Sequence, residues 1–152
     1  MATLMDEFDS YINNLNSAIP RVLDKDVAPA VLDRIIAMSG PAVYDAYHPT
    51  LYERRYSLQQ EDSYETSVGP MSLTITANIM SNPEQPGWGE YVPIEISDII
   101  TNGAYYGPRW RYSGIYNMQP FPRPWMEPGL QQSINDRSAE QALEGGLLAL
   151  GF

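Results

Sequence analysis

The sequence predicts an α+β fold with N-terminal helices, a small antiparallel β-sheet with long loops, and a C-terminal helix. Three patterns in its 152 residues support this prediction. Apolar residues recur every three or four positions near the N-terminus, as on one face of a helix. Over 71–80 they alternate with Ser and Thr, as in a strand with one covered face. Most prolines, glycines and tyrosines follow residue 40, which favours loops there.

The length and composition fit one globular domain. A chain of this length buries about two-thirds of the surface that its unfolded form exposes. Hydrophobic residues make up 43% and charged residues 18%, a mixture that favours a packed core over disorder. We therefore expect a single domain over 1–152, with a helical part at 1–40, a β-sheet and loop-rich part at 41–122, and a C-terminal helix at 123–152.

Two helices are predicted before residue 41. A helix over about 4–18 follows from five apolar residues in steps of three and four: Leu4, Phe8, Ile12, Leu15 and Ile19. Pro20 suits the first turn of a second helix, which keeps the same spacing until Gly40-Pro41 ends it. Pro29 lies inside this second helix, where a proline removes a backbone donor and favours a kink.

Two strand-like segments follow the helices. The residues of 52–60 alternate, with Tyr52, Arg54, Tyr56 and Leu58 on one side. The clearest strand is 71–80, where one face gathers Met71, Leu73, Ile75, Ala77 and Ile79. The acidic segment 59–67 and the Pro- and Gly-rich segment 81–93 are expected to be flexible inserts, and 94–101 a short helix or strand.

Aromatic and arginine side chains gather after residue 104, among too many Gly and Pro residues for a long regular element. We expect an extended aromatic loop or irregular hairpin over 104–122. Tyr, Trp and Arg commonly anchor protein interfaces, although packing within the chain and stacking on nucleic-acid bases are alternatives. The residues predicted to form an interface with another subunit are Tyr105, Tyr106, Arg109, Trp110, Arg111, Tyr112, Phe121, Arg123 and Trp125.

The proline-rich segment 120–130 leads into the predicted C-terminal helix. Each proline fixes its own φ and disfavours helical backbone in the residue before it, so the approach is stiff and extended. Two roles are possible for Trp125. It could lie in the core at the junction between the loop and the helix, or it could contact a neighbouring subunit together with Arg123.

Within the C-terminal helix, Met126, Leu130 and Ile134 share one face. A second helical piece is expected to open with a capping pattern at 138–141, and Gly145-Gly146 is expected to weaken its last turns.

The chain offers few groups for chemistry. It has no cysteine, which excludes disulfides, thiolate catalysis and zinc sites that need sulfur, and its single histidine, His48, excludes sites that need two. His48 precedes Pro49 in a predicted turn, where bonding to a neighbouring carbonyl is expected. No spacing singles out two of the 19 acidic residues, so we expect a solvated acidic surface. The sequence predicts no enzyme, no metal and no cofactor.

A short set of residues resembles a known family. The element Ile-Ile-Thr-Asn-Gly at 99–103 precedes aromatic residues, and Arg-Pro-Trp-Met-Glu-Pro at 123–128 opens the last helix. This order resembles the neck and tail-completion proteins of long-tailed bacteriophages. Those proteins carry the signature Ala-Arg-Pro-Phe-(Leu/Met)-x-Pro-(Ala/Gly)-Leu, where x is any residue. The residues that match it here are Arg123, Pro124, Trp125, Met126, Pro128, Gly129 and Leu130. Trp replaces the usual Phe, and Pro122 replaces the usual Ala.

The resemblance implies a structural protein at the head–tail interface of a virion, assembled in the host cytoplasm. Such a protein forms a homo-oligomeric ring, hexameric or dodecameric, that joins the connector and neighbouring neck and tail proteins. Genome DNA passes through the ring. The net charge of −10 suits passage without tight binding, because carboxylates repel DNA. The inserts 59–67 and 81–93 are expected to become ordered when neighbouring rings dock. No membrane association is expected, because no stretch approaches about 18–20 apolar residues.

Two other functions remain open. An acidic protein that mimics DNA and blocks a host nuclease or regulator would need carboxylates at phosphate-like spacing, whereas the 19 acidic residues are spread along the whole chain. A small hydrolase that uses two carboxylates has only the composition in its favour.

Overall fold

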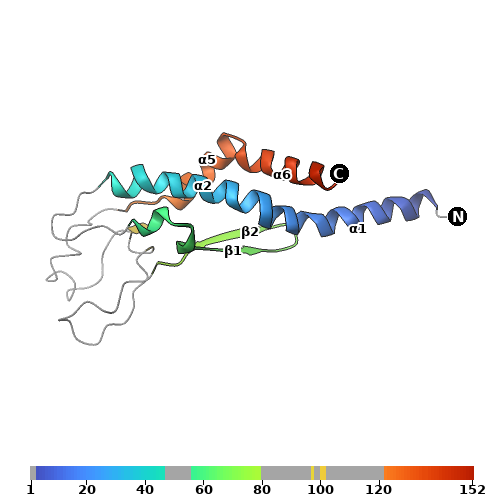
Figure 1. The fold of residues 1–152 in the computed structure, drawn as a ribbon, viewed down its shortest axis with the longest axis horizontal. Coiled ribbons are helices and arrows are strands. Elements are labelled where there is room, and N and C mark those ends of the chain that lie inside the picture. The colour runs from blue at the N-terminus through green and yellow to red at the C-terminus, as the bar shows by residue number, and fades with distance from the viewer. Residues whose placement is uncertain (1–2, 47–55, 80–96, 98–99, 102–121) are drawn as a thin grey trace, which may run out of the picture. The chain divides into compact units, whose positions relative to one another are not determined.

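A computed structural model describes residues 3–46, 56–79, 97, 100–101 and 122–152 (Figure 1). They are mostly helical, with one two-stranded antiparallel sheet between the N-terminal and C-terminal helices in chain order. The predicted α+β class is confirmed. The predictions for 81–93 and 104–121 lie outside the described residues. Within 94–101, Ser97, Ile100 and Thr101 have helical backbone.

The chain divides into two compact units that interleave along the sequence. Unit 1 comprises Met1–Arg34, Thr66–Thr76 and Leu130–Phe152, and unit 2 comprises Ile35–Glu65 and Ala77–Gly129. Each unit is built from segments that lie far apart in the sequence. The single domain over 1–152 stays a prediction.

Helix α1 (Leu4–Val22) begins with a capping box. The Thr3 hydroxyl accepts a hydrogen bond from the Asp6 backbone N–H at 3.3 Å, and the Asp6 carboxylate accepts one from the Thr3 N–H at 2.8 Å. The backbone and side-chain bonds from Thr3 hold the pKa of the Asp6 carboxyl below its usual value. A helix starting at residue 4 is thus confirmed. Its predicted end near 18 is wrong, because Pro20 lies inside α1 instead of opening a new helix.

The helical backbone continues past α1 through two π-helical turns. After α1 come η1 (Leu23–Val27), α2 (Ala28–Ser39) and η2 (Gly40–Tyr44). In η1 the Ala28 N–H donates to the Leu23 carbonyl, five residues earlier. This wide turn directly precedes Pro29, whose ring would crowd the carbonyl four residues back in a regular α-helix. The kink predicted at Pro29 stays a prediction.

The predicted helix end at Gly40-Pro41 is confirmed for the α-helix, because α2 ends at Ser39. The helical backbone nevertheless continues into the π-helical turn η2, which contains both residues. In this turn the Asp45 N–H donates to the Gly40 carbonyl at 2.9 Å.

The predicted strand over 52–60 is wrong in its described part. Tyr56 has a left-handed φ of 53°, which interrupts extended backbone. Two 3-10 turns follow it, η3 (Ser57–Gln59) and η4 (Glu61–Ser63). Residues 52–55 lie outside the described part of the chain.

The sheet is a hairpin of β1 (Tyr64–Val68) and β2 (Leu73–Ala77). Strand β2 confirms the strand predicted over 71–80, with its apolar residues less exposed than the threonines between them. Strand β1 lies in the segment predicted to be a flexible insert, so that prediction is wrong. The Gly69 N–H donates to the Ser72 carbonyl at 2.8 Å and closes the turn between the strands.

The predicted C-terminal helix is confirmed as two helices, α5 (Met126–Asn135) and α6 (Ser138–Ala149). The predicted capping pattern at 138–141 is wrong. Arg137, with a left-handed φ of 60°, precedes α6, and the Ser138 N–H donates to the Asp136 carboxylate at 3.0 Å. Asp136 thus satisfies an N-terminal donor of α6 from outside the helix.

Helix α6 packs against α1 and η1, and the buried Gly146 lies at this contact. A Cβ added at Gly146 would meet Val22 Cγ1 and would lie 2.7 Å from Asp26 Oδ2. The two helical segments approach this closely because the residue has no side chain. Helix α6 continues through Gly145 and Gly146 to Ala149. The expectation that these glycines weaken its last turns stays a prediction.

We expect Gly146→Ala to lower the free energy of unfolding by about 1–3 kcal/mol, because the added methyl group overpacks the contact with Val22 and Asp26. Gly145→Ala is the matched control, since an added Cβ there meets nothing within 4 Å. It should raise stability by up to about 1 kcal/mol through helix propensity. Urea unfolding followed by circular dichroism measures both effects, and equal stability of the two variants would contradict the close approach.

Candidate functional site

The described residues contain no group of three or more His, Cys, Asp or Glu side chains placed to hold a metal ion. None of the helices in the described ranges is long and apolar enough to span a bilayer.

Trp125 is the largest fully buried side chain among the described residues of unit 2. It stands one residue before α5, and its exposed fraction is 0%. Its Nε1–H donates to the Tyr64 hydroxyl at 3.0 Å, and the Tyr64 hydroxyl donates to the Leu58 carbonyl at 2.8 Å. A buried indole N–H and a buried hydroxyl therefore both have partners. These two bonds connect the start of α5 with the start of β1 and with η3.

Tyr44 extends this arrangement to the end of η2. Its hydroxyl oxygen accepts a hydrogen bond from the Leu58 N–H at 2.9 Å. Its ring packs against that of Tyr56, with centroids 4.8 Å apart and planes tilted by 47°. Both backbone polar groups of Leu58 are thus bonded by tyrosine hydroxyls, while its side chain is buried. We call Tyr44, Leu58, Tyr64 and Trp125 the Trp125 cluster.

Burial raises the pKa of the Tyr64 hydroxyl to about 12. The bond from Trp125 acts in the opposite direction, because it stabilises the phenolate, and the nearby Tyr44 adds a smaller upward contribution. Burial has the larger effect because a phenolate loses its hydration inside the unit. Tyr64 is therefore a neutral structural hydroxyl at physiological pH.

Arg123 is also buried, with an exposed fraction of 5%. Its Nη1 donates to the Val43 carbonyl at 3.4 Å, and its backbone N–H donates to the Ile100 carbonyl at 2.8 Å. The side chain thus reaches η2, while the main chain is fixed to the helical backbone at Ile100. A buried guanidinium bonded to backbone acts as a brace between segments distant in sequence.

Arg123 and Trp125 are both buried in unit 2. Of the two roles predicted for Trp125, the structure therefore agrees with the core anchor at the junction. A contact of either side chain with another subunit stays a prediction. The other predicted interface residues lie outside the described part of the chain: Tyr105, Tyr106, Arg109, Trp110, Arg111, Tyr112 and Phe121.

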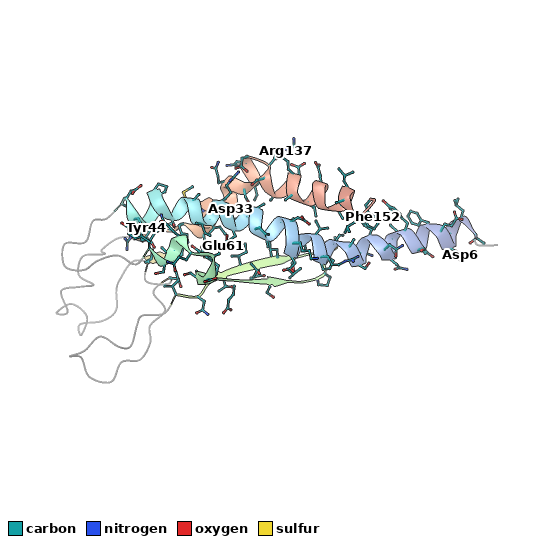
Figure 2. All side chains as sticks on the ribbon, viewed as in Figure 1. Asp6, Asp33, Tyr44, Glu61, Arg137 and Phe152 are labelled. Carbon is teal, nitrogen blue, oxygen red and sulfur yellow. The ribbon has the colours of Figure 1, made fainter. Side chains whose placement is uncertain are left out.

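In unit 1, an ion pair holds the corner between α5 and α6. Arg34 Nε donates to the Asp136 carboxylate at 2.6 Å. The Ser138 backbone N–H first, and Arg34 next, hold the pKa of the Asp136 carboxyl below its usual value. The partners are 102 positions apart, so sequence spacing gave no signal for this pair. Arg137 at the same corner binds Glu140 at 2.7 Å (Figure 2).

Unit 1 also exposes large apolar side chains on its helices. The sequence predicted that Leu4 shares a helix face with Phe8, and Leu130 with Ile134, but it did not predict that these residues are exposed. Contiguous exposed apolar surface is typical of sites that bind other macromolecules. The exposed residues on helices are Leu4, Met5, Phe8 and Tyr11 on α1, Leu130 and Ile134 on α5, and Leu148 on α6, with Leu150 just after it.

A family model named YomN matches residues 5–149, which is nearly the whole chain. The chain therefore belongs to the YomN family, whose description states no function. No curated protein and no solved structure matches the chain at a significant level.

We expect Trp125→Ala to lower the free energy of unfolding by about 3–5 kcal/mol, because it empties a fully buried site and removes the bond to Tyr64. Trp125→Phe keeps an aromatic ring and loses the Nε1–H, so it should cost less, about 1–2 kcal/mol. Chemical denaturation monitored by circular dichroism gives both values. A Trp125→Ala protein with full stability that only fails to assemble would place Trp125 at an interface instead.

We expect the stability of the chain to fall between pH 10 and 12 through ionisation of Tyr64. Its pKa is higher in the folded state, about 12, than the ordinary value of 10.0, so its contribution is complete below pH 10 and is lost as the pH rises. The difference in unfolding free energy between the wild type and Tyr64→Phe should therefore shrink by about 2 kcal/mol over this range.

Urea denaturation at pH 9 and pH 12 measures this difference. Tyr11→Phe, on the surface of α1, controls for the general effect of removing one tyrosine. A pH-independent difference between the wild type and Tyr64→Phe would show that Tyr64 does not ionise from a buried site.

Proposed function

We propose that this member of the YomN family is a structural protein of the phage head–tail interface, a neck or tail-completion ring that joins the connector to the tail. Genome DNA passes through the ring without tight binding. The protein acts through assembly and has no catalytic role. The name of its family is of phage-type origin, which suits this proposal.

The observation on which the proposal rests is the Arg-Pro-Trp-Met-Glu-Pro-Gly-Leu segment at 123–130. It resembles the signature before the last helix of neck and tail-completion proteins. In the structure the segment does lead into a helix, α5, and its Arg and Trp side chains are buried. The residues behind the resemblance thus shape the fold of unit 2. This supports a likeness in architecture, beyond a coincidence of exposed residues.

The surface of unit 1 suits a protein that assembles. Exposed apolar side chains on α1, α5 and α6 have a cost in an isolated chain, because they remain in contact with water. Contact with neighbouring subunits or rings would remove them from water. A ring needs two such surfaces for each subunit, one for each neighbour.

The charge of the chain suits a channel for DNA. The 19 acidic residues against 9 basic ones give a net charge of −10. Because carboxylates repel phosphates, a lumen with this charge would let a duplex slide, whereas a basic lumen would retain it through counterion release.

An acidic mimic of DNA remains the alternative. Such an inhibitor needs carboxylates that are free to replace phosphates at the surface of its target. Several described carboxylates instead bind groups of their own chain: Asp6 binds Thr3, Asp136 binds Arg34 and Ser138, and Glu140 binds Arg137. This observation favours the structural role.

Immunogold labelling of purified virions with an antibody against this chain tests the proposal. We expect gold particles at the junction of head and tail, and their loss when the antibody is first absorbed with the purified protein. Virions without label, prepared so that the neck is open to the antibody, would contradict the structural role. A pull-down that then recovers a host nuclease or regulator would support the DNA mimic.

A further inference from the structure

Helix α1 carries a single apolar seam that is covered over only half of its length. Six residues in steps of four and three form it: Leu4, Phe8, Tyr11, Leu15, Ala18 and Val22. This is the spacing with which helices pack side by side. The C-terminal half of the seam lies in the core of unit 1, with Ala18 0% and Val22 1% exposed. The N-terminal half is open, with Leu4 84% and Phe8 59% exposed.

Helix α6 covers the buried half. Gly146 lets it approach Val22 closely, and Phe152 packs edge-on against Tyr11 with ring centroids 5.6 Å apart. From Tyr11 towards Leu4 the seam residues become steadily more exposed. The open stretch continues the surface that α6 already occupies. It is therefore shaped to receive another helix in the same packing mode.

The charges beside the open seam are all negative. Residues 3–20 contain Asp6, Glu7 and Asp9 and no Lys or Arg, and residues 138–152 contain Glu140 and Glu144 and again no Lys or Arg. Glu7 and Asp9 flank the open apolar face, and a second copy of α1 would bring the same two carboxylates to the contact. A helix with basic residues beside its own apolar stripe would instead offset them.

We propose that the N-terminal half of α1 docks an amphipathic helix of another protein, with Lys or Arg flanking its apolar stripe. Leu4, Met5, Phe8 and Tyr11 supply the apolar contact, and Glu7 and Asp9 supply the acidic margin. The contact spans about two to three helical turns, so it is a small interface that is reinforced by others in an assembly. This inference goes beyond the neck proposal and does not depend on it.

The test uses two synthetic helical peptides with the same leucine stripe, one flanked by lysines and the other by glutamates. Fluorescence anisotropy measures the binding of each labelled peptide to the full chain. We expect the lysine peptide to bind about tenfold more tightly, with an affinity that falls as salt is added. Phe8→Asp should weaken its binding by about tenfold. The combination Glu7→Gln and Asp9→Asn should reduce the preference for lysine.

Met71→Asp is the matched control, because Met71 is also an exposed apolar residue of unit 1 but lies in the hairpin turn. It should leave the affinity for the lysine peptide unchanged, and circular dichroism should show all variants folded. Equal affinity for the two peptides, or an affinity insensitive to Phe8→Asp, would overturn the proposal. Self-association of the chain that Phe8→Asp abolishes would assign the seam to a second copy, and would also overturn it.

Discussion

The hydrogen bond from Trp125 Nε1 to the Tyr64 hydroxyl is the constraint on which the described part of unit 2 depends. The Tyr64 hydroxyl in turn donates to the Leu58 carbonyl, and the Leu58 N–H donates to the Tyr44 hydroxyl. This chain of hydrogen bonds links the start of α5 with β1, η3 and η2. These elements are short and contain few apolar residues of their own. The buried indole of Trp125 supplies the apolar contact that holds these elements together. The hydrogen bond of its N–H to Tyr64 fixes their arrangement.

The buried residues Arg123 and Trp125 and the exposed apolar residues of this chain lie on different elements. Tyrosine, tryptophan and arginine are typical of interfaces, but Arg123 and Trp125 lie inside unit 2. The surface that suits recognition is instead built from simple apolar residues on the helices of unit 1, such as Leu4 and Phe8. The segment 123–130 thus places buried side chains in unit 2, while α1 exposes apolar side chains on its N-terminal half.

Periodicity predicted the elements whose own residues determine them. The start of α1, strand β2 and the C-terminal helices follow from apolar spacing and agree with the structure. The failures depend on distant residues. Pro20 remains inside α1 although proline disfavours a helix interior, and β1 has few apolar residues but pairs with β2. Nothing local could reveal that Trp125 bonds a tyrosine 61 positions away.

A double-mutant cycle on Tyr64 and Trp125 tests the central claim most directly. The unfolding free energies of the wild type, Tyr64→Phe, Trp125→Phe and the double variant give the energy that couples the two side chains. The account predicts a coupling of about 1 kcal/mol or more, because either single change removes the same buried bond. Strictly additive effects would contradict it, since they would show that Tyr64 and Trp125 stabilise the chain independently.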